Sequence, residues 1–188
     1  MTPDGGDILL PIARAAIART LGEQARAREE APWLSEPGAS FVTLRKHGEL
    51  RGCIGSLEAR RALLLDVKSN AVAAAFRDPR FEPVSCSEFA EIRIEVSLLS
   101  SVTRLEVHRE DDVLARLRPH EDGVILEYGP HRGTFLPQVW ESLPEPASFL
   151  RQLKRKAGLP ESFWSTGIRL SRYTVLKWSE TEALPELH

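Results

Sequence analysis

The sequence contains, at residues 41–55, the stretch FVTLRKHGELRGCIG, which predicts a β-hairpin. Phe41–Leu44 and Leu50–Ile54 are short, largely apolar runs of the kind that form strands. Between them, residues 46–49 include a glycine and predict a tight turn. The hairpin would present Cys53 on its second strand.

One helix is predicted before this hairpin and another after it. From Asp7 to about Ala31, isoleucine and leucine recur at helical spacing, with charged side chains between them. Pro32 would end this helix, because proline removes a backbone donor. Between Ala59 and Phe76, apolar side chains form a wide stripe at helical spacing, which predicts a buried helix that ends before Pro79.

The rest of the chain is predicted to contain short strands and two more helices. Residues 91–100 alternate strictly between apolar and polar side chains, which predicts a half-buried strand. We also expect strands at 105–107, 124–128 and 168–178, the last as one or two strands, and helices at 111–117 and 147–157. Regular strand-helix-strand alternation is missing, so we predict an α+β fold with a largely antiparallel sheet flanked by helices.

The composition is that of one folded domain. The 188 residues are 42% hydrophobic and 28% charged, and a chain of this length can bury a core without disulfides or metals. The net charge of -2 argues against binding of nucleic acid through its phosphates. No apolar run approaches the roughly 20 residues of a membrane span. We therefore predict one domain, residues 1–188, with flexible tails at 1–6 and 180–188, in the cytoplasm and without membrane or nucleic-acid partners.

The cysteines and histidines form no recognisable cofactor site. Cys53 and Cys86 are the two cysteines, and no C-x-x-C pair occurs, so we expect reduced thiols and neither a zinc site nor an iron-sulfur cluster. The sequence also lacks histidine pairs at the spacing of metal ligands. We therefore predict no metal and no cofactor.

The hexapeptide LRGCIG at Leu50–Gly55 resembles the motif of the AMMECR family. The bacterial and archaeal members of this family resemble protein A of the AmmeMemoRadiSam system. Other landmarks follow in the family's order: Asn70-Ala71, Asp78-Pro79-Arg80-Phe81, Ile94–Leu99, Arg132–Val139 and Phe149–Leu159. The similarity extends from about Leu10 to Trp178. It implies a larger and a smaller lobe, and association with a Memo-like protein and a radical S-adenosylmethionine protein, without implying a particular reaction.

Cys53 is the candidate catalytic residue, because a thiolate is a strong nucleophile and the neighbouring Gly52 lets a ligand approach closely. On a regular strand, Arg51 would share the face of Cys53 and stabilise the thiolate. A cysteine between the apolar Leu50 and Ile54 is also typical of an ordinary core position. Both interpretations stay open.

The residues predicted to bind a substrate come from three segments. Glu95 and Ser97 lie on the polar face of a predicted strand and would line a cleft with Cys53. The second group, Arg132, Gly133 and Gln138, combines a guanidinium, a flexible backbone and an amide, which suits binding of a carboxylate or phosphate. The alternative is that these residues only form a tight hairpin. The predicted set is Arg51, Gly52, Glu95, Ser97, Arg132, Gly133 and Gln138.

Three further side chains have local interpretations. His47 and His131 are candidate bases for the thiol, or solvated turn residues. Asp78 is expected to pair with Arg80 at the end of the long helix.

Two functions follow as hypotheses. In the first, the chain is an accessory or enzymatic component of a modification pathway, with a small-molecule or peptide substrate in a cleft around Cys53. The alternative is a non-catalytic protein-protein interaction module, in which the LRGCIG strand and residues 132–139 dock a partner. The first predicts a reactive, reachable thiol, and the second an inert thiol with an exposed apolar patch.

Overall fold

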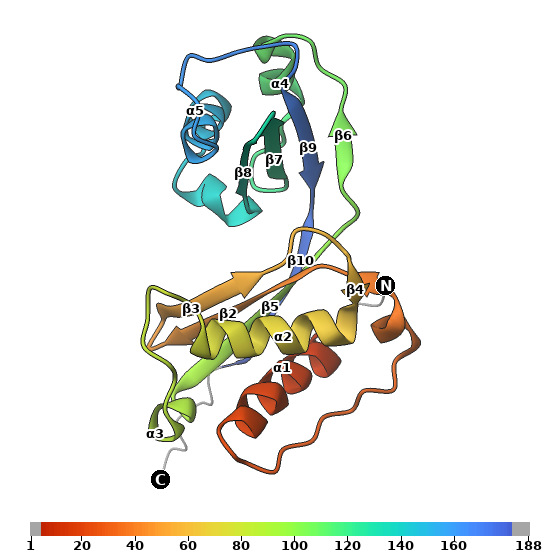
Figure 1. Ribbon diagram of the computed structural model, residues 1–188, viewed down its shortest axis with the longest axis vertical. Helices are drawn as coiled ribbons and strands as arrows, with labels where there is room; N and C mark the ends of the chain where they lie inside the picture. Colours follow the sequence, from red (N-terminus) through yellow and green to blue (C-terminus); the bar gives the residue numbers. More distant parts are fainter. Residues whose placement is uncertain (1–4, 182–188) are drawn as a thin grey trace. The chain divides into compact units, whose positions relative to one another are not determined.

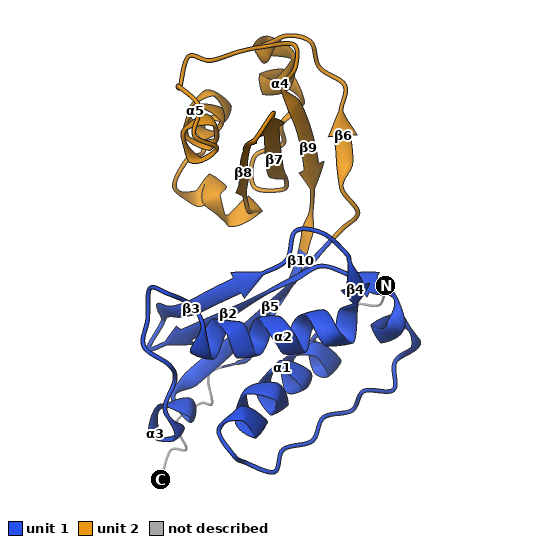
Figure 2. Ribbon diagram, in the orientation of Figure 1, with its two compact units in different colours: residues 1–99, 176–188 blue, residues 100–175 orange. Residues whose placement is uncertain are grey.

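The computed structural model describes residues 5–181, which divide into two compact units (Figure 2). Unit 1 comprises residues 1–99 and 176–188, and unit 2 comprises residues 100–175. Of the predicted tails, residues 1–4 and 182–188 lie outside the described residues. Gly6 begins the first helix, and Glu180 accepts a hydrogen bond of 2.6 Å from Nε of Arg14.

Unit 1 contains a four-stranded sheet with the strand order β10-β5-β2-β3 (Figure 1). β2 pairs antiparallel with both β3 and β5, which confirms the predicted hairpin and the predicted strand after it. The strands are β2 (Ser40–Lys46), β3 (Glu49–Gly55), β5 (Ile92–Leu99) and β10 (Val175–Ser179).

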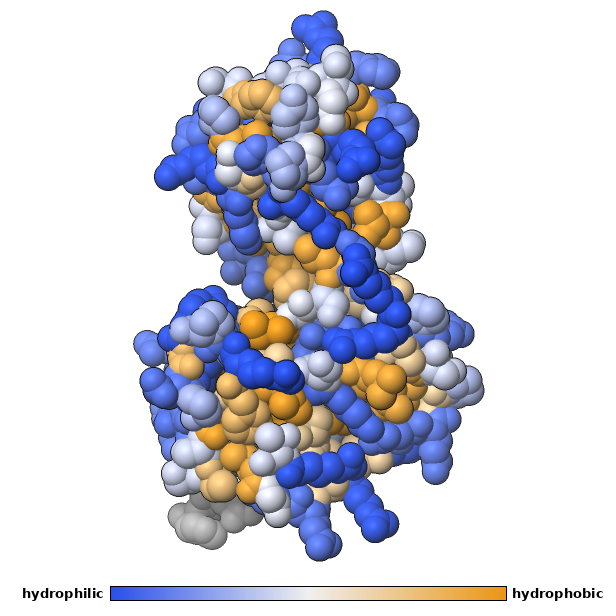
Figure 3. Space-filling model, viewed as in Figure 1, coloured by the Kyte–Doolittle hydropathy of each residue, from blue (hydrophilic) through white to orange (hydrophobic). Residues whose placement is uncertain are grey.

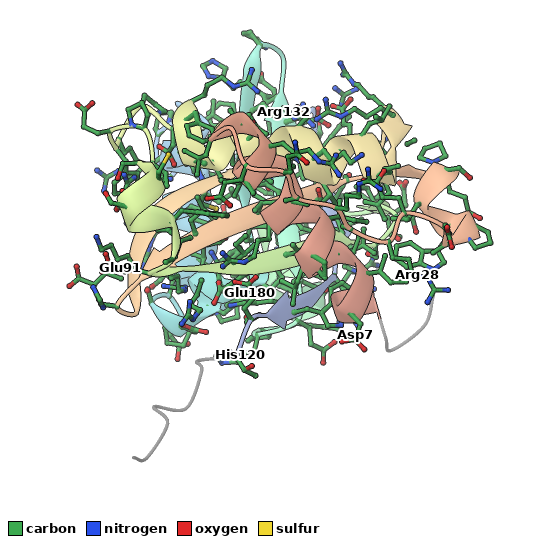
Figure 4. The ribbon with its side chains drawn as sticks, turned by 90° about the horizontal axis from the view of Figure 1, so that it is seen from below. Asp7, Arg28, Glu91, His120, Arg132 and Glu180 are labelled. Carbon is green, nitrogen blue, oxygen red and sulfur yellow. The ribbon has the colours of Figure 1, made fainter. Side chains whose placement is uncertain are left out.

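Two helices, α1 (Gly6–Thr20) and α2 (Leu63–Phe76), pack on one face of this sheet (Figure 4). Their apolar stripes form one core with alternate residues of the strands, because side chains on a strand point to opposite faces in turn. The core includes Leu9, Ile12, Ile17, Val42, Leu44, Val67, Ala71, Ile94 and Val96.

The first helix is shorter than predicted, because it ends at Thr20 and not near Ala31. Gly22 follows with φ at 91°, a left-handed conformation that favours glycine. The N–H of Gly22 donates to the carbonyl of Arg19 and that of Glu23 to Ala18, the pattern of a Schellman motif. These bonds end the helix although the apolar spacing continues beyond it.

The second helix begins at Leu63, four residues later than predicted. The preceding β4 (Arg61–Ala62) pairs antiparallel with β1 (Pro37–Gly38). The N–H of Leu63 also donates to the carbonyl of Glu36. A contact with a distant segment therefore replaces the expected first turn. Two short helices that were not predicted, η2 (Pro32–Ser35) and α3 (Cys86–Phe89), complete the unit.

Unit 2 contains a second four-stranded sheet, with the strand order β6-β9-β7-β8. The indole of Trp140 stacks on the Phe149 ring at 3.8 Å between centroids, in a separate apolar core. The predicted 168–178 segment divides into β9 and β10, which belong to different sheets. The elements are β6 (Thr103–Leu105), α4 (Glu110–Arg116), β7 (Gly123–Tyr128), β8 (His131–Phe135), η3 (Pro137–Glu141), α5 (Pro146–Lys156) and β9 (Arg169–Tyr173).

The fold is α+β, as predicted, with helices beside antiparallel strand pairs in each unit. Among the described residues, no helix has the length and apolar content that a membrane crossing needs.

Candidate functional site

The strand that carries the LRGCIG motif, β3, follows a tight turn and contains a bulge. His47 and Gly48 connect β2 to β3 with φ at 50° and 82°, as a two-residue type I′ turn requires. The register with β2 shifts between Leu44 and Arg45. Arg51 is therefore the extra residue of a β-bulge, which interrupts the regular strand that its predicted pairing with the Cys53 thiol required.

The Arg51 side chain binds the loop and short helix that follow α2. Its Nε and Nη2 donate to the two carboxylate oxygens of Glu88 at 2.7 and 3.0 Å, and Nη2 donates to the carbonyl of Glu82 at 2.8 Å. The hydrogen bonds from Arg51 lower the pKa of Glu88, although burial opposes them. Nη1 of Arg51 is buried and has no hydrogen-bond partner among the described residues.

Asp78 and Arg80 hold the backbone of β3 at Cys53. Asp78 Oδ2 accepts a hydrogen bond of 2.9 Å from the N–H of Cys53, and the carboxylate accepts from Arg80 Nε and Nη2 at 2.9 and 2.7 Å. The bonds from Arg80, and then the one from Cys53, hold the pKa of Asp78 well below its usual range against the effect of burial. The predicted pairing of Asp78 with Arg80 is confirmed, and it fixes the edge strand to the loop.

Both glycines of the motif lie where a side chain would meet a neighbour. A Cβ at Gly52 would overlap the carbonyl oxygen of Ala74, so the backbone of α2 packs directly on β3. A Cβ at Gly55 would overlap the ring of Phe41. These glycines are therefore required by packing within unit 1.

The face of this sheet that points away from α1 and α2 carries Cys53 together with Glu95 and Ser97. Thr43 pairs with Cys53 on one side and with Glu95 on the other, so the three side chains form one row. In the next row, Phe41 pairs with Ser97. We call this surface the outer face, and it consists of Phe41, Thr43, Arg45, Cys53, Arg93, Glu95 and Ser97.

The Cys53 thiol lies on this face and not in the apolar core. Its Sγ is 3.3 Å from Oγ1 of Thr43, and the residue is half-buried. Its strand neighbours Gly52 and Ile54 point to the helices instead. The interpretation of Cys53 as an ordinary core hydrophobe does not describe this position.

Glu95 is bound by two cations. Its Oε1 accepts from Nε of Arg45 at 3.0 Å, and its Oε2 lies 3.1 Å from Nζ of Lys177 on β10. Only 13% of the Glu95 side chain is exposed. The carboxylate is therefore an acceptor held in place by charge and not a free base.

The other predicted substrate-binding residues, Arg132, Gly133 and Gln138, belong to unit 2. Arg132 lies on β8 and is 3.7 Å from the carboxylate of Glu127. Gly133 packs against α5, since a Cβ there would lie 2.9 Å from the backbone nitrogen of Ala157. Gln138 is exposed in η3.

The two histidines that were candidate bases are engaged elsewhere. Nε2 of His47, in the turn of the hairpin, lies 2.8 Å from the carboxylate of Glu91. Nδ1 of His131 lies 3.1 Å from the carbonyl of Ala157 within unit 2. The structure therefore gives neither histidine a hydrogen bond to the Cys53 thiol.

A buried polar network in unit 1 was missed by the sequence predictions. Asp66 of α2 accepts hydrogen bonds from Ser40, Ser56, Arg61 and Asn70, at distances of 2.8 to 2.9 Å. Asp66 and Asn70 are four residues apart and share one face of a helix. Polar residues on a stripe that is otherwise apolar were the available signal. Because these bonds link groups of the fold to one another, the network explains the attachment of α2 to β2.

A groove of about 530 Å³ lies along α1 and the loop after it, and its walls include Leu10, Pro11 and Arg26. It contains none of the predicted site residues. Among residues 5–181, no group of three or more histidine, cysteine, aspartate or glutamate side chains could hold a metal ion.

Comparison with known proteins gives the family of the chain. MJ0810 of Methanocaldococcus jannaschii is 33% identical over 196 residues, which cover 100% of this chain and 96% of that protein. MK0488 of Methanopyrus kandleri is 36% identical over 174 residues, which cover 87% and 82%. The crystal structure of an uncharacterized protein of Pyrococcus horikoshii, PH0010, matches with a TM-score of 0.86 at 30% identity, over 96% of this chain and 93% of that chain. The model of the AMMECR1 family matches residues 10–178, and the chain therefore belongs to the AMMECR1 family.

Proposed function

We propose that the outer face binds a small-molecule or peptide substrate at Cys53, and that the chain is an accessory or enzymatic component of a modification pathway. The observation that carries the proposal is the difference between Cys53 and its neighbours on β3. Arg51 binds Glu88, and Gly52 and Gly55 are required by packing. The thiol has neither of these structural roles and lies half-buried beside Thr43.

The chemistry of this row supports a nucleophilic thiol. A cysteine thiolate attacks electrophilic carbon, and the hydroxyl of Thr43 at 3.3 Å can donate a hydrogen bond to it. Ser97, a buried residue in the next row, is the proposed hydroxyl contact for a polar substrate group. Glu95 contributes as the charged partner of Arg45 and Lys177.

Arg132 and Gln138 are proposed substrate contacts in unit 2, where both are exposed. The packing of Gly133 on Ala157 supports the simpler alternative, a tight hairpin, for the middle of this group. As a substrate contact, Arg132 should be sensitive to substitution, and Arg132→Gln should weaken substrate binding.

We propose a Memo-like protein and a radical S-adenosylmethionine protein as partners, since the family resemblance implies them. The cytoplasm is the proposed compartment, supported by two free cysteines. Affinity purification of the tagged chain from its native cells, after mild crosslinking, tests the partners. Enrichment of either one above a tag-only control supports the proposal, and its absence contradicts it.

Labelling of the folded protein with iodoacetamide tests the thiol. Peptide mass spectrometry would follow Cys53, with the exposed Cys86 as the internal reference. We expect Cys53 to be alkylated at a rate comparable with that of Cys86. A Cys53 that is alkylated only after unfolding would overturn the proposal.

A protein-protein interaction module is the second candidate, and exposed leucines favour it. Leu50 of the motif is 40% exposed and Leu65 of α2 is 55% exposed. Figure 3 shows apolar patches among charged residues on the face of unit 1 that carries α2, and such patches mark interaction sites. This candidate predicts that Leu50→Lys abolishes capture of a partner, while Cys53→Ser leaves it unchanged.

A further inference from the structure

The outer face carries more positive than negative charge. Arg45 on β2 and Arg93 on β5 are direct cross-strand partners, and Lys177 of β10 joins them through Glu95. Like charges directly opposite on a sheet are destabilising. Among the described residues, Glu95 is the one carboxylate that binds any of these three cations. We call Arg45, Arg93 and Lys177 the basic cluster.

The hydrogen bonds of the fold leave the basic cluster only partly neutralised. Arg45 and Lys177 share Glu95. Within the described part of the chain, the Arg93 guanidinium bonds to the carbonyls of Ala90 and Ile92, both at 3.3 Å, and to no carboxylate. Holding Glu95 in place does not require Arg93, so this arginine is the member of the cluster whose charge no carboxylate of the described residues balances.

Neighbouring carboxylates do not complete the neutralisation. Glu88 binds Arg51 and Lys46. Glu91 binds His47 and Lys46. The side chains of Arg45 and Lys177 are 36% and 41% exposed, so a small ligand can reach them.

Of the basic cluster, Arg45 lies nearest to the thiol, while Arg93 and Lys177 lie on the next two strands of the sheet. Arg45 is two residues from Thr43 on the same face of β2, and Thr43 pairs with Cys53. Diagonal neighbours on a sheet are about 7–8 Å apart, a distance that an arginine side chain spans. Guanidinium groups bind carboxylates and phosphates through paired hydrogen bonds.

We infer that the substrate of the outer face carries a carboxylate or phosphate group, which Arg93, Arg45 and Lys177 bind on the same face of the sheet as the Cys53 thiol. As the substrate class of that surface, this inference rests on the proposed function.

Two alkylating reagents of similar size test the inference. Iodoacetate carries a carboxylate and iodoacetamide is neutral. The ratio of their rates at Cys53, divided by the same ratio at Cys86 in the same sample, measures attraction of an anion to the outer face. We expect a value of about 2, because Arg45 places one cation roughly 7–8 Å from Cys53 and attracts an anion even in a medium close to water. Inorganic phosphate should slow the iodoacetate reaction, whereas chloride at the same ionic strength should not.

The matched variants are Arg93→Gln and Arg28→Gln, which remove the same charge. Arg28 is exposed in the loop after α1 and lies outside the basic cluster (Figure 4). Arg93→Gln should lower the normalised ratio toward 1 and abolish protection by phosphate. Arg28→Gln should retain both.

The outcomes separate this inference from the proposed function. A reactive Cys53 with a ratio near 1 in the wild type overturns the anionic substrate and leaves the proposed function standing. If Cys53 reacts with neither reagent, the proposed function fails. Anion binding is then tested by the rise in Tm that inorganic phosphate causes in the wild type and in the two variants. A rise that is lost in Arg93→Gln and kept in Arg28→Gln supports anion binding, and equal behaviour of the two variants overturns it.

Discussion

Gly52 is the residue of β3 at which the backbone of α2 leaves no room for a side chain. A Cβ there would overlap the backbone oxygen of Ala74, which cannot move aside as a side chain would. Gly48 has a φ of 82° and open space around it, so alanine there meets only backbone strain of about 1–2 kcal/mol. We predict that Gly52→Ala lowers the free energy of unfolding by about 3 kcal/mol, more than Gly48→Ala does. Urea denaturation of both variants measures this, and equal losses would contradict the packing role.

Asp78 makes the stability of the protein sensitive to acid. Its pKa is lower in the folded than in the unfolded chain, so the unfolded state takes up the proton first as the pH falls. The contribution of the Asp78 carboxylate to stability is complete above the usual carboxyl pKa of about 4. It is lost as the pH falls toward the pKa of Asp78 in the folded protein. Removal of the charge in Asp78→Asn should cost about 2 kcal/mol at neutral pH.

The pH dependence supplies the control for this prediction. Denaturation at pH 7 and at progressively lower pH should show the difference between wild type and Asp78→Asn shrinking below about pH 4. Arg80→Gln removes the partner charge and should reproduce part of the loss. A constant difference across this range would mean that the carboxylate charge is not what stabilises the strand.

At the scale of elements, the sequence predicts best those features that depend on neighbouring residues. The hairpin and β5 are correct because strict alternation and a His47-Gly48 turn are local signals. The predicted start of α2 is wrong, because residues 61–62 pair with a segment more than twenty positions away. The helix α3 was missed, since its four residues are too few to show a period.

The candidate site follows the same division. Alternation predicts that Glu95 and Ser97 share a face, and antiparallel pairing adds Cys53 to it through Thr43. The bulge that redirects Arg51 depends on the register of two strands, which no single-strand pattern encodes. Ser40 and Ser56 join Asp66 only when β2 and the residue after β3 pack on α2.

The end of α1 offers a test of an element boundary. Gly22 has a φ of 91°, and a Cβ added to it would have no neighbouring atom within 4 Å. Alanine there would meet no steric clash but would hold a left-handed conformation, which costs about 1 kcal/mol. We predict that Gly22→Ala lowers stability by this amount in urea denaturation. A gain in stability with more helical circular dichroism would instead mean that the helix can extend toward residue 31.

At the scale of the whole molecule, the chain consists of two units with separate apolar cores. The residues of the LRGCIG strand and of β5 belong to unit 1, and those of β8 and η3 to unit 2. The outer face of unit 1 holds the candidate nucleophile, Cys53, together with the basic cluster. We propose that this thiol is available in the native protein, while its strand neighbours maintain the fold.

The rate of Cys53 alkylation by iodoacetamide at increasing urea, below the unfolding transition, tests that claim most directly. If the thiol is reachable in the folded state, the rate stays constant until the transition, as it should for the exposed Cys86. If labelling requires unfolding, the logarithm of the rate rises with urea from the start, with the slope of the global unfolding equilibrium. The first result is the one predicted, and the second would contradict a role for Cys53 in binding or chemistry.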